Sequence, residues 1–344
     1  MRLWLGVAAV LAVAGAAHAA GTKTVKDWTA VCNNLGDCTA FGFSGEGADT
    51  PAYLMIQRQA GPAAQPTVTI VYGSNDTQPA QTWTLALDNK PIAGLGPVRA
   101  AGGENGARAT LTGAAAEHLI DALRNGQALE LESGGKSLAA VSLAGSAAVL
   151  LWVDDQQGRV GTVTALTRKG AAPASSVHPR LSPPLVRPAP PASQSGLPKQ
   201  APKSLIKSVS DCDFDASSGE PDDTIARLAP GVVLWGPECD MAAYNETSVF
   251  FVGDEHAGHL KRVIFPEAPG AGQATDDTLM NVGFDAASQT LSSFSKGRGI
   301  ADCGSTEAWV WDGKAFQMAR EETMPECRGV VPDDWPSLFV SRQK

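Results

Sequence analysis

Six cysteines are the residues of this chain whose types and spacing most directly suggest chemistry. They form three couples of near neighbours, which are Cys32 with Cys38, Cys212 with Cys239, and Cys303 with Cys327. Many pairings of six cysteines are possible, and the local pairing is the simplest. Metal binding and redox catalysis are the alternatives, but no Cys-x-x-Cys occurs and no histidine is clustered with the cysteines. We therefore predict three structural disulfides in an oxidising compartment, and neither a metal site nor a cofactor.

Two other motifs are close to known sites without matching them. Glu255-His256-Ala257-Gly258-His259 holds the only close histidine pair, but helical metal sites use His-x-x-x-His with a glutamate beside the first histidine. Gly258 indicates a turn, so an exposed loop is predicted there. Gly134-Gly135-Lys136-Ser137 is similar to the end of a phosphate loop, yet Glu130 replaces the earlier glycine that such a loop requires. A hairpin turn is predicted instead.

Adjacent carboxylates provide the last candidates for chemistry. Asp222-Asp223 and Asp333-Asp334 are pairs of the kind that could perform acid–base catalysis. Both pairs lie in polar segments, where neighbouring acids are usually solvated. We predict no catalytic residue in this chain.

The N-terminus has the features of a secretory signal peptide. Arg2 precedes a short apolar stretch, and Ala17-His18-Ala19 resembles a cleavage site, so the signal is predicted to occupy residues 1–20. A membrane anchor is the alternative, but the apolar stretch is short for a bilayer span. Residues 138–153 form the longest later apolar stretch and are interrupted by serine and glycine. The mature chain is therefore predicted to be periplasmic or secreted, without a transmembrane segment.

The net charge of −9 is unevenly distributed. Residues 156–210 contain no Asp or Glu but eight Lys and Arg. The rest of the chain is strongly acidic, which argues against a nucleic-acid partner. Solvation of a linker explains the basic stretch most simply. Attraction to an anionic envelope surface, or to the protein's own acidic domains, is the alternative.

A change in composition divides the chain. Residues 170–204 are rich in Pro, Ala and Ser, which favours an extended, semi-rigid spacer. We predict an N-terminal domain at residues 21–169 and a C-terminal domain at residues 205–344.

Strand and helix signals predict an α+β fold that is mainly antiparallel β. The N-terminal strands are expected at residues 28–32, 53–57, 67–72, 82–87 and 128–132. The helices of the N-terminal domain are expected at residues 114–125 and at 146–157, the second capped by Ser146. The C-terminal domain is expected to have strands at residues 232–235, 248–252, 260–265, 290–295, 308–311 and 315–320, with one helix at residues 221–228.

Several segments resemble the DUF1176 family, an uncharacterised family of secreted bacterial proteins. In the N-terminal domain they are residues 27–32 with Cys38, residues 143–148 and residues 154–159. In the C-terminal domain they are residues 297–304, 309–313 and 327–329. The first domain is also similar to the invasion-associated locus B proteins, with a Trp-x3-Cys opening. The resemblance implies a secreted or periplasmic protein and supplies no activity or catalytic residues.

Two disulfide-bonded domains without a recognisable set of catalytic residues indicate a non-enzymatic binding or interaction protein of the cell envelope. Its partner, an envelope component or another protein, is unknown. A hydrolase of envelope polymers with an unrecognised acid–base pair is one alternative. An inhibitor of secreted enzymes such as lysozyme is another.

Overall fold

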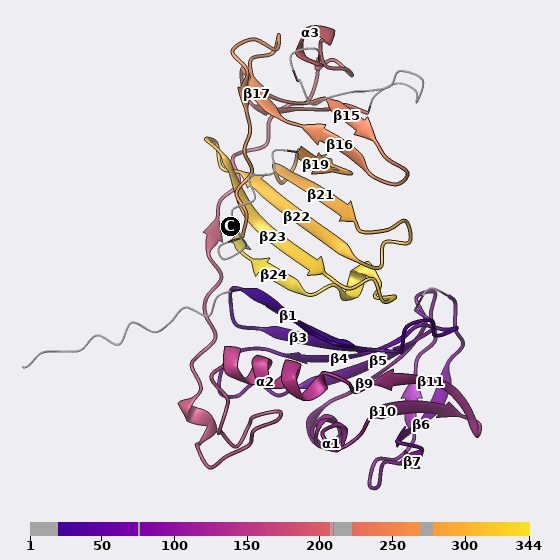
Figure 1. Ribbon diagram of the computed structural model, residues 1–344. Helices are drawn as coiled ribbons and strands as arrows, with labels where there is room; N and C mark the ends of the chain where they lie inside the picture. The colour runs from indigo at the N-terminus through magenta and orange to yellow at the C-terminus, as the bar shows by residue number, and fades with distance from the viewer. Residues whose placement is uncertain (1–19, 75, 207–208, 210–221, 269–277) are drawn as a thin grey trace, which may run out of the picture.

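The computed structural model describes residues 20–344 except residue 75 and residues 207–208, 210–221 and 269–277. The predicted signal peptide, apart from Ala20, lies outside the described residues, and so does Cys212. The regular structure is mostly antiparallel β-strand with few helices, so the predicted fold class is confirmed. In the described part, no helix has the length and apolar character needed to cross a membrane. Two β-rich halves are stacked end to end (Figure 1).

The N-terminal half is built around a six-stranded antiparallel sheet in the order β1-β2-β3-β4-β5-β9. Its strands are β1 (Gly21–Val25), β2 (Trp28–Cys32), β3 (Cys38–Phe43), β4 (Ala52–Arg58), β5 (Thr67–Tyr72) and β9 (Ala107–Leu111). A second sheet has the order β11-β10-β6-β7, and β8 also pairs with β6. Its strands are β6 (Gln81–Leu87), β7 (Lys90–Pro91), β8 (Val98–Ala100), β10 (Ala128–Ser133) and β11 (Lys136–Ser142).

Two helices cover the inner face of the six-stranded sheet, α1 (Gly113–Leu123) and α2 (Ser146–Gln156) (Figure 1). Both match the predicted helices, but the predicted cap of the second is wrong. The N-cap residue of α2 is Gly145. Its φ of 101° would be strained for any other residue type, which explains a glycine at this position. A Cβ atom there would lie 1.9 Å from the Val25 carbonyl oxygen.

The six-stranded sheet is buried on both faces. In β4, Leu54 and Ile56 point to the inner core, whereas Tyr53 and Met55 point to the outer face, and all four are at most 3% exposed. Side chains alternate between the faces of a strand, so an apolar residue at every position requires two covering layers. The helices and the second sheet supply one layer, and the C-terminal half supplies the other.

The C-terminal half consists of three antiparallel sheets, in the orders β13-β14-β17-β18, β15-β16-β19 and β20-β21-β22-β23-β24. The first two contain β13 (Thr224–Ala229), β14 (Val232–Gly236), β17 (Phe251–Gly253), β18 (Lys261–Arg262), β15 (Glu238–Met241), β16 (Glu246–Val249) and β19 (Thr278–Met280). The third contains β20 (Gly283–Asp285), β21 (Thr290–Lys296), β22 (Gly304–Trp311), β23 (Phe316–Met324) and β24 (Ser337–Val340), and a 3-10 turn (Pro332–Asp334) precedes β24.

The helix predicted at residues 221–228 is wrong. Residues 224–229 form β13, which pairs with β14, and the buried residues Ala226 and Leu228 alternate with less buried ones. Period-two burial is the strand pattern, and Pro230-Gly231 makes the hairpin turn rather than ending a helix. Two of the predicted strands are also corrected. Residues 248–252 are divided between β16 and β17, and only Lys261–Arg262 of residues 260–265 is a strand.

The proline-rich segment, residues 170–204, begins beside the N-terminal half and runs as an extended strap along the C-terminal half (Figure 1). Within it, β12 (Leu185–Val186) pairs in parallel with β25 (Arg342–Gln343). Val186 packs on Val310 and Ala319. The strap also contains a 3-10 turn (Ala174–Ser176), and a short helix, α3 (Lys203–Ile206), follows it. The segment is thus extended as predicted, and it is tied to the body of the protein.

A shared apolar cluster, here called the junction core, joins the two halves. Its members from the N-terminal half are Phe41, Phe43, Tyr53, Met55 and Val71, and those from the C-terminal half are Cys303, Met324, Val330 and Trp335. Polar contacts surround it. Tyr53 Oη donates to Asp334 Oδ2 at 2.6 Å, and Arg108 forms a bidentate ion pair with the same carboxylate at 2.8 and 3.1 Å. The halves are therefore joined by a buried apolar cluster of their own, beside the separate core of each half.

Candidate binding cleft

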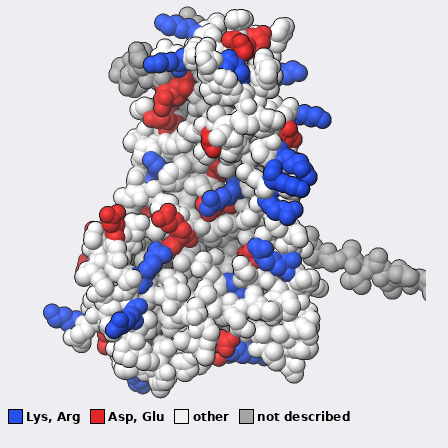
Figure 2. Space-filling view, turned by 180° about the vertical axis from the view of Figure 1, so that it is seen from behind, with Lys and Arg blue, Asp and Glu red and all other residues white. Residues whose placement is uncertain are grey.

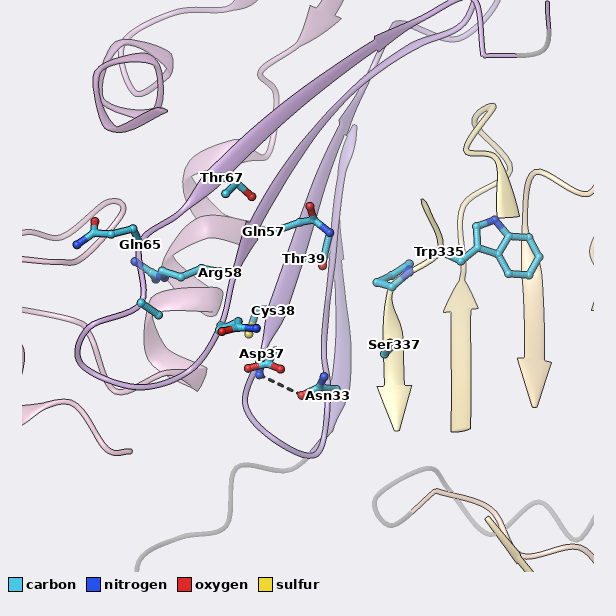
Figure 3. Close-up of a pocket in the computed structure, with 13 residues that line it drawn as sticks. Asn33, Asp37, Cys38, Thr39, Gln57, Arg58, Gln65, Thr67, Trp335 and Ser337 are labelled. Carbon is cyan, nitrogen blue, oxygen red and sulfur yellow. Dashed lines mark hydrogen bonds between the residues drawn. The ribbon is translucent and has the colours of Figure 1, made fainter. Parts of the chain in front are cut away.

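A cleft of about 510 Å³ opens at the junction, between one end of the outer face of the six-stranded sheet and the segment that enters β24 (Figure 3). Its lining residues from the N-terminal half are Asn33, Asp37, Cys38, Thr39, Gln57, Arg58, Gln59, Ala64, Gln65 and Thr67. Those from the C-terminal half are Trp335, Pro336 and Ser337. Most of these side chains are amides or hydroxyls.

Three polar side chains form a row across neighbouring strands of this cleft. Gln57 on β4 is the register partner of Thr39 on β3 and of Thr67 on β5. Register partners project from the same face of a sheet, about 5 Å apart. Within the described residues none of the three side chains forms a hydrogen bond, so their donors and acceptors are available to a ligand. This polar row lies on the outer face of the six-stranded sheet, at the end that the C-terminal half no longer covers.

The neighbouring loop is held by the first disulfide. Cys32 and Cys38 are bonded across the β2–β3 turn. Asn33 Oδ1 accepts hydrogen bonds from the Leu35 and Asp37 amides at 2.9 and 3.0 Å. Gly36 adopts a φ of 82°, which favours glycine. The disulfide and the asparagine turn therefore give the cleft a preorganised wall.

Asp37 is the carboxylate in the lining of this cleft, and its charge is already compensated. Its oxygens accept hydrogen bonds from Arg180 of the strap at 2.6 to 3.1 Å and from the Ala60 amide at 2.9 Å. Burial opposes ionisation, but the hydrogen bonds from Arg180 and Ala60 outweigh it and lower the pKa of Asp37. The cleft therefore presents little free charge.

Below the wall lies a buried polar network from the inner side of the sheet. Arg58 and Asp154 form an ion pair at 2.9 Å with side chains 1% and 0% exposed. Gln157 accepts from Arg58 Nε at 2.7 Å and donates to the carbonyls of Gly36 and Arg58. The network links α2 to the cleft loop, which gives residues 154–159 a structural role.

The other motifs singled out in the sequence do not reach this cleft. His256 and His259 are exposed in the loop between β17 and β18, where Asp254 Oδ1 accepts hydrogen bonds from the amides of His256 and Gly258. These two hydrogen bonds lower the pKa of Asp254. Gly134 and Gly135 form the β10–β11 hairpin turn with φ values of 56° and 75°. The predictions of a loop and a hairpin turn are confirmed.

The two pairs of adjacent aspartates also lie outside the lining of this cleft. Asp223 accepts hydrogen bonds from the Ala201 and Glu238 amides at 2.7 and 2.9 Å, so it organises the start of β13. Asp334 joins the halves, as described above, whereas Asp333 is exposed. Sequence reasoning missed the role of Asp334, because its partners Tyr53 and Arg108 are distant in the chain.

The predicted disulfides are confirmed for Cys32–Cys38 and Cys303–Cys327. Cys239 is disulfide-bonded as well. Its predicted partner, Cys212, lies outside the described residues, so that pairing stays a prediction. Asp302 lies next to the Cys303–Cys327 bond, but it accepts hydrogen bonds from Arg298 and the Gly329 amide, which is a structural arrangement.

Three carboxylates gather on the sheet of the C-terminal half, outside the cleft. Glu307 on β22 and Glu321 on β23 are register partners, and Glu267 lies nearby. Burial raises the pKa of Glu321 to about 7, and repulsion from Glu307 and Glu267 adds to the shift. Like charges on directly opposite strand positions destabilise a sheet. The cluster is therefore a pH-sensitive element of stability.

Glu321→Gln is expected to make the free energy of unfolding less dependent on pH. The folded state holds the Glu321 proton more tightly than the unfolded state, so the stabilisation is complete below about pH 4.5 and is lost as the pH rises through about 7. At pH 8 the variant should exceed the wild type by about 1–2 kcal/mol, less than the full shift implies because the carboxyl is partly exposed. Urea denaturation at several pH values measures this, with exposed Glu104→Gln as the control. Parallel stability profiles for wild type and Glu321→Gln would contradict the assignment.

Comparison with known proteins adds a family and one relative. A family model described as "Protein of unknown function (DUF1176)" matches residues 22–342, which include both halves and the strap. The uncharacterized protein YpfG of Escherichia coli (strain K12) is 27% identical over 347 residues, covering 93% of each chain. No solved structure matches the chain significantly. The similarity of the first half to invasion-associated locus B proteins stays a prediction.

Proposed function

Because this chain belongs to the DUF1176 family of proteins of unknown function, we propose its function from the structure. It is a binding protein of the cell envelope, and its junction cleft takes a neutral, hydroxyl-rich ligand such as an oligosaccharide. The disulfides support the extracytoplasmic location, since such bonds persist in oxidising compartments.

The polar row is the observation that carries this proposal. Thr39, Gln57 and Thr67 present two hydroxyls and an amide along a line of about 10 Å, spaced like strand neighbours. Successive hydroxyls of a sugar chain both donate and accept hydrogen bonds, as these side chains do. A charged ligand would find no uncompensated partner in the row. The ligand class that fits is therefore neutral and polar.

The same cleft does not support the hydrolase alternative. Glycosidases use two carboxyl groups, roughly 5 to 9.5 Å apart, as acid and base or as acid and nucleophile. Among the described lining residues Asp37 alone carries a carboxylate, and Arg180 holds it ionised. The geometry favours binding without turnover.

Gln57→Ala is expected to weaken oligosaccharide binding about three- to tenfold, the loss that one or two hydrogen bonds produce. Isothermal titration of the mature chain with neutral oligosaccharides, and with charged ones for comparison, measures the dissociation constants. Gln317→Ala is the matched control, because Gln317 is an exposed strand glutamine outside the cleft. Absence of binding at millimolar concentrations, or equal effects of the two variants, would refute the proposed site. Release of shortened oligosaccharides would instead indicate an enzyme.

A further inference from the structure

We propose that the edge formed by the strap and β25 is a docking surface for an anionic lipid bilayer. This surface, called here the basic edge, is formed by other residues than the junction cleft, and it combines cations with apolar side chains. It is defined by Leu181, Leu185 and Arg187 of the strap together with Arg342 of β25.

The pairing of β12 with β25 brings Leu185, Arg187 and Arg342 to one face. Leu185 is the register partner of Arg342. Val186 points inward and is 8% exposed, against Val310 and Ala319. Residues on either side of it along an extended chain point the opposite way, so Leu185 and Arg187 both face outward. An exposed leucine therefore lies between two exposed arginines.

The charge of the basic edge is not compensated within the described residues. By contrast, Arg180 of the strap pairs with Asp37, and Lys169, which directly precedes the strap, pairs with Asp121. Arg187 and Arg342 form no ion pair in the part of the chain that is described. In the sequence, the stretches that contain these residues, 156–210 and 335–344, have no Asp or Glu. Figure 2 shows Lys and Arg gathered on one side of the molecule at mid-height.

The negative charge on the rest of the molecule would orient the protein at an anionic surface. The chain carries a net charge of −9, so an anionic surface repels most of it and attracts the basic edge. Orientation by such a field would turn the basic edge toward the membrane.

The two exposed leucines favour a bilayer over a soluble polyanion. Leu181 is 42% exposed and Leu185 is 39% exposed, on the same strap as Arg187. Apolar side chains beside cations are the pattern of interfacial membrane binding, in which the leucines enter the boundary between headgroups and acyl chains. A polyanion in solution would use the arginines alone.

Cosedimentation of the full mature chain with vesicles tests this proposal. Vesicles of phosphatidylcholine with phosphatidylglycerol should bind the protein, and vesicles of phosphatidylcholine alone should not. Binding should weaken as salt is raised. Arg187→Gln with Arg342→Gln should lower the partition coefficient about fivefold for each arginine, the factor that ~1 kcal/mol per basic residue near an anionic surface produces. Leu185→Ser should lower it further.

Matched variants separate the basic edge from net charge and general apolarity. Lys90→Gln with Lys136→Gln removes the same charge from exposed positions on β7 and β11, and Ile300→Ser removes an aliphatic side chain that is 59% exposed elsewhere. Both controls should bind as the wild type does. Failure of the wild type to bind, or equal losses in the paired variants, would overturn the proposal. So would polyphosphate binding of equal strength that Leu185→Ser leaves unchanged, because a soluble polyanion would then be the partner.

Discussion

Asp154→Asn is expected to lower the free energy of unfolding by about 3–5 kcal/mol, the cost of leaving buried charge without its partner. Asp154 is 0% exposed. Its two oxygens accept four hydrogen bonds, from Arg58, from the Leu166 and Thr167 amides, and from the Thr167 hydroxyl. An asparagine keeps the shape, but it removes the negative charge and turns an NH2 group toward donors.

Two guanidinium groups depend on that single carboxylate. Burial lowers the pKa of Arg159 to about 10, and repulsion from Arg58 adds to the shift. Arg159 also donates to the Gly61 carbonyl at 2.5 Å and to Thr164 Oγ1 at 2.8 Å, so it cannot turn toward solvent without losing these contacts. Loss of the Asp154 charge therefore affects α2, β4 and the cleft loop together.

Asp155→Asn is the matched control for this prediction. Asp155 is the next residue along α2, it is exposed, and its substitution should change stability by less than about 0.5 kcal/mol. Chemical denaturation followed by tryptophan fluorescence measures both variants. Similar stabilities for the two single variants would show that the ion pair contributes little.

Strands with strong local signals could be predicted from the sequence, and the strand-rich fold follows from them. Thr67–Tyr72 is β-branched and bounded by proline, and it forms β5 as expected. Cys38–Phe43 forms β3 but was not predicted, because Gly42 and Thr39 obscure the apolar pattern of a strand buried on both faces. In residues 221–228 the acidic residues and Pro230 suggested helix ends, whereas pairing with β14 determined a strand. Tertiary pairing overrode local propensity there.

The cleft could not be predicted, because strand register creates it. Thr39, Gln57 and Thr67 belong to three strands and match no motif, and each is an ordinary polar residue in its own segment. A weak signal does exist. Gln57 lies two residues beyond Met55 and four beyond Tyr53, on the face where both are buried. A polar side chain at the end of an apolar strand face indicates that the face becomes exposed to solvent at that point.

The segments of the family resemblance have a structural explanation. Residues 154–159 build the buried network below the cleft. Residues 297–304 and 327–329 take part in the contact between the halves, through Cys303 in the junction core and through the Gly329 carbonyl, which accepts a hydrogen bond from the Ser74 hydroxyl at 2.5 Å. Arg328 donates to the Ser44 carbonyl at 2.5 Å and lies 5.3 Å from the centre of the Phe43 ring. Such contacts account for these segments as parts of a shared architecture.

Asp334→Ala is the second prediction with a large expected effect, and it tests whether the halves unfold together. Burial and the neighbouring Asp334 carboxylate raise the pKa of Tyr53, whose side chain is 0% exposed, so its hydroxyl stays a donor. Removing the acceptor leaves this hydroxyl unsatisfied and Arg108 unpaired. We expect a loss of about 2–4 kcal/mol in the free energy of unfolding, since hydrogen bonds to charged groups contribute more than neutral ones.

Cooperativity between the halves gives this prediction its sharper readout. Wild-type unfolding should be one transition, because the junction core and the Asp334 contacts link both sheets. Asp334→Ala should separate it into two, whereas Asp333→Ala, at the exposed neighbouring position, should leave it single. In a double-mutant cycle, Tyr53→Phe and Asp334→Ala should be non-additive by about 1–2 kcal/mol. Additive effects, or two transitions already in the wild type, would mean that each half has its own stability and that the junction cleft is not a rigid site.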